Sequence, residues 1–283
     1  MIYMDSYDGA KIAVHLWNRQ SQKAVLLLHG WPFSYQMFES QISLLVRRGY
    51  LVVAPDMRGF GISSETGQGY GYDSLAADIY RVIAGLKLQK CTAAGFGMGG
   101  AVLLRYMTNY KGYGIGKLIL MAAVAPGLCR TEMNVYGQDK DDLDKMIHRL
   151  LTDRPKMVQD ISRQMFACPK SEAYMDWFYQ MALNGSGLGT VMAAVTMRDE
   201  NVEKDLKNVC VPATIIHGGR DCFVSREMAD IQHRDIVSGF RKRGWGISQP
   251  VPVSRYCLKN SGHGIGWDEM EEFNCLFLRE VIQ

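Results

Sequence analysis

The chain has 283 residues, of which 47% are hydrophobic and 22% are charged, and its formal net charge is +3. These values exclude a disordered or fibrous chain and are typical of a globular protein with one large core and an insertion. The small positive charge is scattered and favours no nucleic-acid partner, and no apolar run approaches the roughly 18 residues of a membrane span.

In chain order, most of the predicted elements alternate between strands and helices. Residues 24–28 are a continuous apolar run, typical of a strand buried on both faces of a parallel sheet. Residues 2–6 and 11–17 alternate in polarity around Asp8-Gly9, which predicts a hairpin at an antiparallel edge. The predicted strands are residues 2–6, 11–17, 24–28, 50–55, 91–94, 117–123, 213–217 and 253–258.

The predicted helices complete a doubly wound α/β arrangement. They are residues 37–47, 74–86, 101–106, a helix that begins near 225, and 270–281. Asp73 is the predicted N-cap of the second helix, and residues 239–250 are predicted to form a loop.

Between residues 129 and 205 the pattern changes, because no strand-like run is present and the spacing is helical. We predict helices at residues 141–151, 155–166 and 173–183. The chain is therefore divided into a first part of an α/β core at 1–128, a helical cap insertion at 129–205 and a second part of the core at 206–283. Trp177 and Met181 are predicted substrate-binding residues of the cap; a peripheral helical layer is the alternative interpretation.

The seven cysteines are scattered, odd in number and without a Cys-x-x-Cys pair. This pattern is typical of reduced thiols and not of a disulfide framework or a zinc site. The first residues also lack the basic segment and apolar run of a secretion signal. We therefore expect a cytoplasmic protein that holds no metal and binds neither nucleic acid nor a membrane.

A glycine cluster at residues 95–100 joins a predicted strand to a predicted helix. Its shape is that of the nucleophile elbow Gly-x-Ser-x-Gly, whose central residue is strained and exposed. Here the centre is Gly97. A turn without chemistry is one alternative. A dinucleotide-binding Gly-x-Gly-x-x-Gly is another, but it would come too late in the chain and lacks an acid about 20 residues further on.

Asp221 and His263 each follow a later predicted strand, so the chain carries an elbow, an Asp and a His in the order of the α/β-hydrolases. Over nearly its whole length the chain resembles this superfamily, and within it the cofactor-free haloperoxidase and esterase group. The motifs that carry the resemblance are His-Gly-Trp-Pro at 29–32, Asp-Met-Arg-Gly-Phe-Gly-Ile-Ser at 56–63, Gly-Phe-Gly-Met-Gly-Gly at 95–100, His-Gly-Gly-Arg-Asp at 217–221 and Ser-Gly-His-Gly at 261–264. The elbow of that group has serine where this chain has Gly97.

The resemblance implies an α/β-hydrolase fold, with a mostly parallel sheet and an inserted helical cap. It implies that His263 is the general base, that Asp221 orients it, and that Gly97 occupies the nucleophile position without the serine. The backbone N–H groups of Trp31 and Met98 would form the oxyanion hole, and Trp31 would also contact substrate. No cofactor is expected, the partner is a small-molecule substrate, and a homo-oligomer is left open.

These residues predict a serine-hydrolase-type scaffold for a small ester, lactone or amide. We expect little covalent hydrolase activity, because Gly97 replaces the nucleophile, either in an inactivated variant or by natural loss. One alternative is a nucleophile-free α/β-hydrolase that uses the His–Asp dyad in lyase, hydratase or oxygenase-like chemistry. Another is a ligand-binding protein that has lost turnover. Whether the chain is an enzyme is therefore open at the level of sequence.

Overall fold

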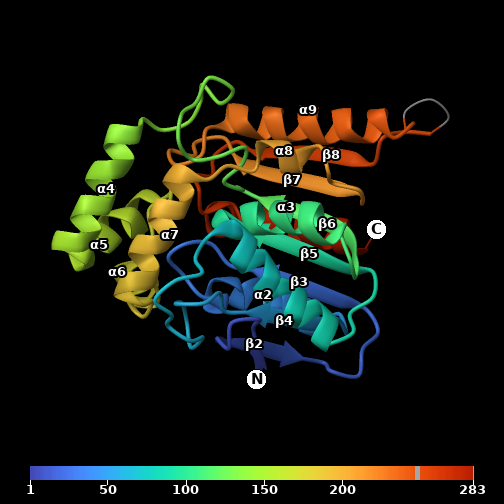
Figure 1. Cartoon of the computed structure of the whole chain (residues 1–283), viewed down its shortest axis with the longest axis horizontal. Helices are drawn as coiled ribbons and strands as arrows, with labels where there is room; N and C mark the ends of the chain where they lie inside the picture. Colours follow the sequence, from blue (N-terminus) through green and yellow to red (C-terminus); the bar gives the residue numbers. More distant parts are fainter. Residues whose placement is uncertain (246–248, 283) are drawn as a thin grey trace.

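One eight-stranded sheet forms the centre of the molecule (Figure 1). The computed structural model describes residues 1–245 and 249–282. The strand order is β1-β2-β4-β3-β5-β6-β7-β8; β2 pairs antiparallel with β1 and β4, and the other pairs are parallel. The strands are β1 (Ile2–Asp5), β2 (Lys11–Trp17), β3 (Ala24–Leu28), β4 (Leu51–Pro55), β5 (Cys91–Phe96), β6 (Ile115–Met121), β7 (Ala213–Gly218) and β8 (Val253–Leu258).

Helices cover both faces of this sheet, so the predicted doubly wound α/β fold is confirmed. Side chains of β3 alternate between two cores: Leu26 and Leu28 pack on one face, Val25 and Leu27 on the other. The helices of the core are η1 (Tyr35–Phe38), α1 (Glu39–Arg47), α2 (Tyr72–Gly85), α3 (Met98–Tyr110), α8 (Glu203–Leu206), α9 (Arg226–Lys242), α10 (Ile265–Asp268) and α11 (Met270–Ile282).

Four further helices lie together beside one end of the sheet, at the left of Figure 1. They are α4 (Lys140–Thr152), α5 (Arg154–Gln164), α6 (Glu172–Leu183) and α7 (Gly187–Asp199). The first three match the helices predicted in the insertion. The sequence pattern did not predict α7, because its buried side includes Gly189, Thr190 and two alanines instead of a stripe of large apolar side chains.

The antiparallel edge is confirmed by the register of β1 and β2, in which Ile2 lies opposite Val14. The prediction of Asp73 as a helix N-cap is wrong, because α2 begins at Tyr72 and the Asp73 carboxylate instead accepts hydrogen bonds of 2.9 Å from Arg105 and Asn109 on α3.

The predicted loop at 239–250 overlaps the end of α9, which continues to Lys242, and residues 246–248 lie outside the described part of the chain. Across residues 1–245 and 249–282, no helix is long and apolar enough to cross a membrane.

Candidate active site

The turn between β5 and α3 has the geometry of a nucleophile elbow. Gly97 has φ +53°, and α3 begins at the next residue. A Cβ atom built on Gly97 would lie 3.4 Å from Nε2 of His263, at ordinary van der Waals distance. A Cβ on Gly95 would lie 2.7 Å from the Gly99 carbonyl oxygen, and one on Gly99 would lie 2.5 Å from the His29 carbonyl oxygen. The flanking positions therefore require glycine, whereas the central position has room for a side chain aimed at His263.

His263 and Asp221 form a hydrogen-bonded pair at the carboxyl ends of β8 and β7. The distance from His263 Nδ1 to Asp221 Oδ2 is 2.7 Å. The other carboxylate oxygen of Asp221 accepts the N–H groups of Phe223 at 2.8 Å and Val224 at 3.0 Å. Because Nδ1 donates its proton to the carboxylate, Nε2 of His263 presents its lone pair on the side of Gly97.

The protein holds Asp221 in its charged form. Burial alone would raise the pKa of this carboxyl, but the neighbouring His263 and His217 and the Val224 N–H outweigh burial, so the pKa lies below its ordinary value. His217 is also buried, its Nε2 donates to the Val224 carbonyl at 2.9 Å, and burial lowers its pKa. The charged Asp221 is thus fixed between two histidine side chains, of which only His263 reaches the elbow.

Contacts from several elements fix the loop that carries His263. The rings of Phe96 and Phe223 lie at edge angles to its imidazole, with centroids 4.9 and 5.5 Å away. The Gly264 N–H donates to the carbonyl of Met165 at 2.7 Å, so the insertion holds this loop in place.

Two backbone N–H groups flank the elbow, those of Trp31 and Met98. Neither donates to a protein acceptor within the described chain. The Trp31 indole donates to the Thr190 carbonyl of α7 at 2.9 Å, which fixes the loop after β3 against the insertion. His29, two residues before Trp31, is fully buried: its Nε2 accepts the Met57 N–H at 2.8 Å, and burial lowers its pKa. A neutral His29 therefore supports the loop that presents the Trp31 N–H.

A cavity of about 400 Å³ lies over these groups and contains Trp31, Gly97, Met98 and His263 in its wall. Four methionines and a phenylalanine supply much of the rest of the wall, a lining that the sequence did not reveal. The other lining residues are Val124, Leu128, Gln138, Asp142, Lys145, Met146, Arg149, Met157, Ile161, Gln164, Met165, Met197, Cys222, Phe223 and Val224.

Comparison with known proteins identifies the family of the chain. A family model for the alpha/beta hydrolase fold matches residues 23–155. AB hydrolase superfamily protein YisY of Bacillus subtilis (strain 168) is 37% identical over 254 residues, which cover 90% of each chain. The chain belongs to the α/β-hydrolase superfamily.

Further relatives of this α/β-hydrolase carry esterase and haloperoxidase names. The structure of an esterase from Exiguobacterium antarcticum superposes with a TM-score of 0.91 at 32% identity and covers 99% of both chains. A non-heme haloperoxidase of Rhodococcus erythropolis is 29% identical over 230 residues, or 79% of this chain and 83% of the relative.

The predicted substrate-binding residues of the insertion lie elsewhere in this α/β-hydrolase. Met181 is buried and packs with Phe178 in the core on that side, and Trp177 is partly buried against the same cluster. Neither residue is in the wall of the 400 Å³ cavity. Their role in substrate binding stays a prediction.

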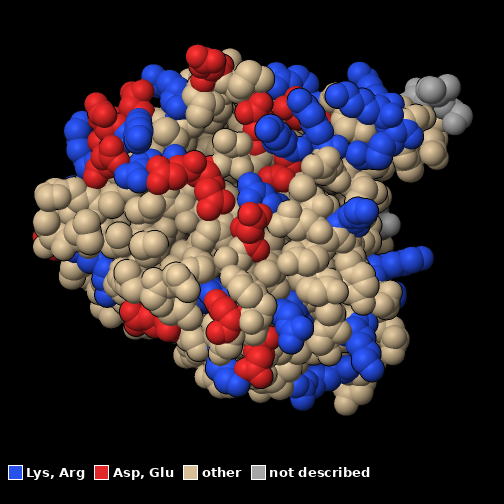
Figure 2. Space-filling model, viewed as in Figure 1, with Lys and Arg blue, Asp and Glu red and all other residues tan. Residues whose placement is uncertain are grey.

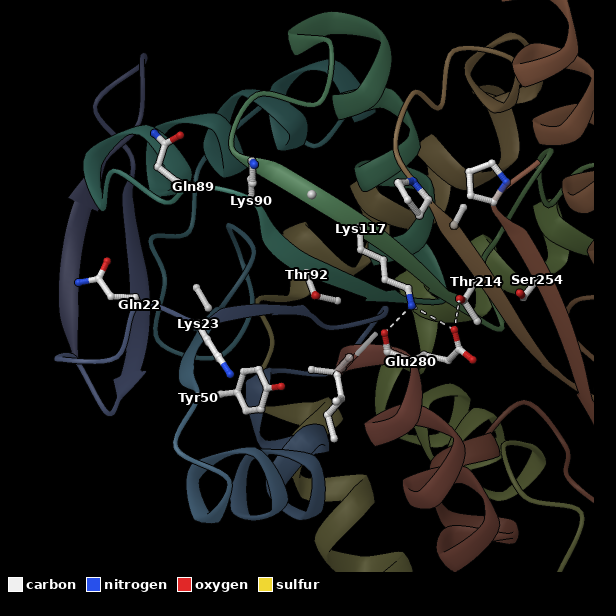
Figure 3. Close-up of a pocket in the computed structure, with 17 residues that line it drawn as sticks. Gln22, Lys23, Tyr50, Gln89, Lys90, Thr92, Lys117, Thr214, Ser254 and Glu280 are labelled. Carbon is white, nitrogen blue, oxygen red and sulfur yellow. Dashed lines mark hydrogen bonds and ion pairs between the residues drawn. The ribbon is translucent and has the colours of Figure 1, made fainter. Parts of the chain in front are cut away.

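A second cavity, of about 630 Å³, lies at the opposite end of the sheet, where the parallel strands begin (Figure 3). It is polar: Lys117 Nζ and Thr214 Oγ1 both donate to the Glu280 carboxylate, at 3.1 and 2.8 Å. None of the predicted site residues lines it. The larger cavity is therefore separate from the elbow and the dyad.

The surface around the insertion carries charges of both signs. Figure 2 shows Lys and Arg interleaved with Asp and Glu over α4, and the pairs include Lys145 with Asp142 at 2.8 Å and Arg198 with Asp144 at 2.6 Å. Among the residues that the structure describes, no group of three or more His, Cys, Asp or Glu side chains is placed to hold a metal ion.

Proposed function

We propose that this α/β-hydrolase is a serine-hydrolase-type scaffold for a small ester, lactone or amide in which Gly97 occupies the position of the nucleophile. The observation that carries the proposal is the direction of the Gly97 Cβ position, 3.4 Å from Nε2 of His263. In a triad, the serine oxygen lies between such a carbon and the imidazole. The esterase and haloperoxidase names of the relatives support the same class of small-molecule substrate.

We assign each remaining part of the proposed mechanism to a residue of the site. His263 is the general base and Asp221, at 2.7 Å, orients its imidazole and stabilises the imidazolium. The N–H groups of Trp31 and Met98 receive the oxyanion of the tetrahedral intermediate. We further propose that residues 129–205 act as a cap, inserted between core segments 1–128 and 206–283, because this insertion supplies most of the methionines that line the cavity.

Direct attack by water is the second candidate function, and the intact dyad favours it. A charged Asp221 that accepts hydrogen bonds from His263, Phe223 and Val224 keeps the imidazole oriented, although Gly97 offers it no hydroxyl to deprotonate. A water molecule that gives its proton to Nε2 would attack the ester carbon directly. Collapse of the tetrahedral intermediate then releases the acid and the alcohol, which takes the proton back from His263, and no acyl-enzyme forms.

Pre-steady-state kinetics with p-nitrophenyl acetate test the proposal. We expect slow, linear release of p-nitrophenol without a burst, and a further decrease in the His263→Ala variant. A burst of one equivalent per chain would show that another residue forms an acyl-enzyme. Cys222, which lies in the cavity wall, would be the first residue to replace, although burial and the neighbouring Asp221 raise the pKa of its thiol.

A further inference from the structure

We propose that the second cavity, at the end of the sheet where the parallel strands begin, binds the phosphate monoester of a sugar or of another polyol. The cavity has a volume of about 630 Å³, within the range of about 300–1,000 Å³ that is usual for small-molecule sites. None of the residues proposed for ester chemistry is in its wall. The inference is therefore independent of the proposed function.

A row of polar side chains forms one wall of this cavity. It consists of Thr92, Lys117, Thr214 and Ser254, which lie near the starts of β5, β6, β7 and β8. Thr92 lies opposite Lys117 in the register, and Thr214 lies opposite both Ser254 and Ile119. Because Ile119 follows Lys117 by two residues, all four polar side chains are on the same face of the sheet. Parallel strands that are covered on both faces usually carry apolar residues, so the row indicates a polar compartment.

The positive charges of the wall exceed its negative charge. The wall contains three lysines, Lys23, Lys90 and Lys117, and a single carboxylate, that of Glu280. Lys117 Nζ and the Thr214 hydroxyl already donate to this carboxylate, at 3.1 and 2.8 Å. The charges of Lys23 and Lys90 are therefore not balanced within the wall.

These two lysines lie at the same edge of the sheet. Lys23 immediately precedes β3 and Lys90 immediately precedes β5, and these neighbouring strands pair Val25 with Thr92. Each lysine is two residues before its member of that pair, so the two begin at the same level of the sheet. In Figure 3 both lie to the left of the hydrogen-bonded Lys117. The unbalanced charge is thus gathered at one end of the cavity.

A phosphate monoester matches this arrangement of charge and hydroxyl groups. It carries a charge of about −1.5 to −2 at neutral pH, and lysine binds phosphate as a point charge. Tyr50, Thr92 and Ser254 supply hydroxyls, and Figure 3 shows no hydrogen bond between any of them and the other wall residues. We therefore place the phosphate between Lys23 and Lys90, with the hydroxyl groups of the ligand along the polar row.

Isothermal titration calorimetry of the full chain with glucose 6-phosphate, at neutral pH and low ionic strength, tests the proposal. We expect saturable binding of one ligand per chain. Lys23→Gln and Lys90→Gln should each weaken binding about tenfold or more, because each removes a charge-assisted contact with the phosphate. Glucose, which lacks the charge, and succinate, which lacks the hydroxyls, should bind more weakly by a similar factor. Absence of saturable binding, or equally tight binding of either comparison ligand, would refute the assigned ligand class.

Two control variants locate the bound ligand. Lys87→Gln is the matched control for Lys90→Gln, because both lysines are exposed and have a positive φ, +53° and +52°, but Lys87 is not in the cavity wall. Lys145→Gln instead removes a lysine from the wall of the 400 Å³ cavity. Both controls should bind glucose 6-phosphate as the parent does. An equal effect of Lys87→Gln and Lys90→Gln, or weaker binding by Lys145→Gln, would place the ligand elsewhere and refute the proposal.

Discussion

Replacing Gly97 with serine is expected to create an esterase, because the proposed mechanism lacks only a hydroxyl beside the His263–Asp221 pair. The new Cβ would lie 3.4 Å from Nε2 of His263, so the hydroxyl one bond further on comes within hydrogen-bonding reach of the imidazole. Asp221 holds that imidazole at 2.7 Å. In a comparable triad, removal of the nucleophile reduces turnover by about 10⁶, so the substitution can raise turnover by several orders of magnitude.

The same substitution should lower the free energy of unfolding by about 1 kcal/mol, since a serine at φ +53° is strained and glycine is not. Steady-state hydrolysis of p-nitrophenyl esters of increasing chain length measures the gain, and urea unfolding measures the strain. The double variant Gly97→Ser/His263→Ala is the control and should lose the gain, falling to the rate of the His263→Ala variant. The reasoning is refuted if Gly97→Ser folds but hydrolyses no short-chain ester faster than the parent.

Further predictions concern stability. Burial lowers the pKa of His29 and His217 in the folded protein from the ordinary value of 6.5. Below about pH 6.5 the unfolded chain therefore binds more protons than the folded protein does. The free energy of unfolding, measured with urea, should decrease as the pH falls below this value. Gly99→Ala should cost about 1–3 kcal/mol in the same assay, because its Cβ would lie 2.5 Å from the His29 carbonyl oxygen. Arg58→Met should cost about 3–5 kcal/mol, because it leaves the buried Asp78, paired with Arg58 at 2.7 Å, without its charged partner. An unchanged urea midpoint would contradict this.

The sequence predicted the fold and the residues around the elbow because these depend on local signals. Apolar runs such as residues 24–28 mark strands buried on both faces, and the carboxyl ends of parallel strands meet at one edge of the sheet. Asp221 and His263, which lie at the ends of two such strands, could therefore be placed near Gly97 from chain order alone. The structure brings the three together at hydrogen-bonding and van der Waals distances.

The wall of the cavity could not be predicted in the same way. Met157 and Met165 lie on or beside a helix of the insertion, α5. There the 3.6-residue period shows which residues face inward, but not which of them face a cavity and which pack a core. Trp177 and Met181 have the same kind of pattern, yet they pack against the core around Phe178. Which side chains face the cavity and which pack the core depends on how the helices of the insertion cross one another, and the sequence pattern carries no direct signal for these crossings.

The measurement that tests the central claim most directly is labelling with a fluorophosphonate probe, followed by mass spectrometry of the peptides. The parent should remain unlabelled, because residue 97 has no hydroxyl for His263 to activate. Gly97→Ser should be labelled at residue 97, and labelling should disappear in Gly97→Ser/His263→Ala. Stable labelling of any residue in the parent, or a folded Gly97→Ser that does not react, would contradict the assignment of Gly97 as the nucleophile position.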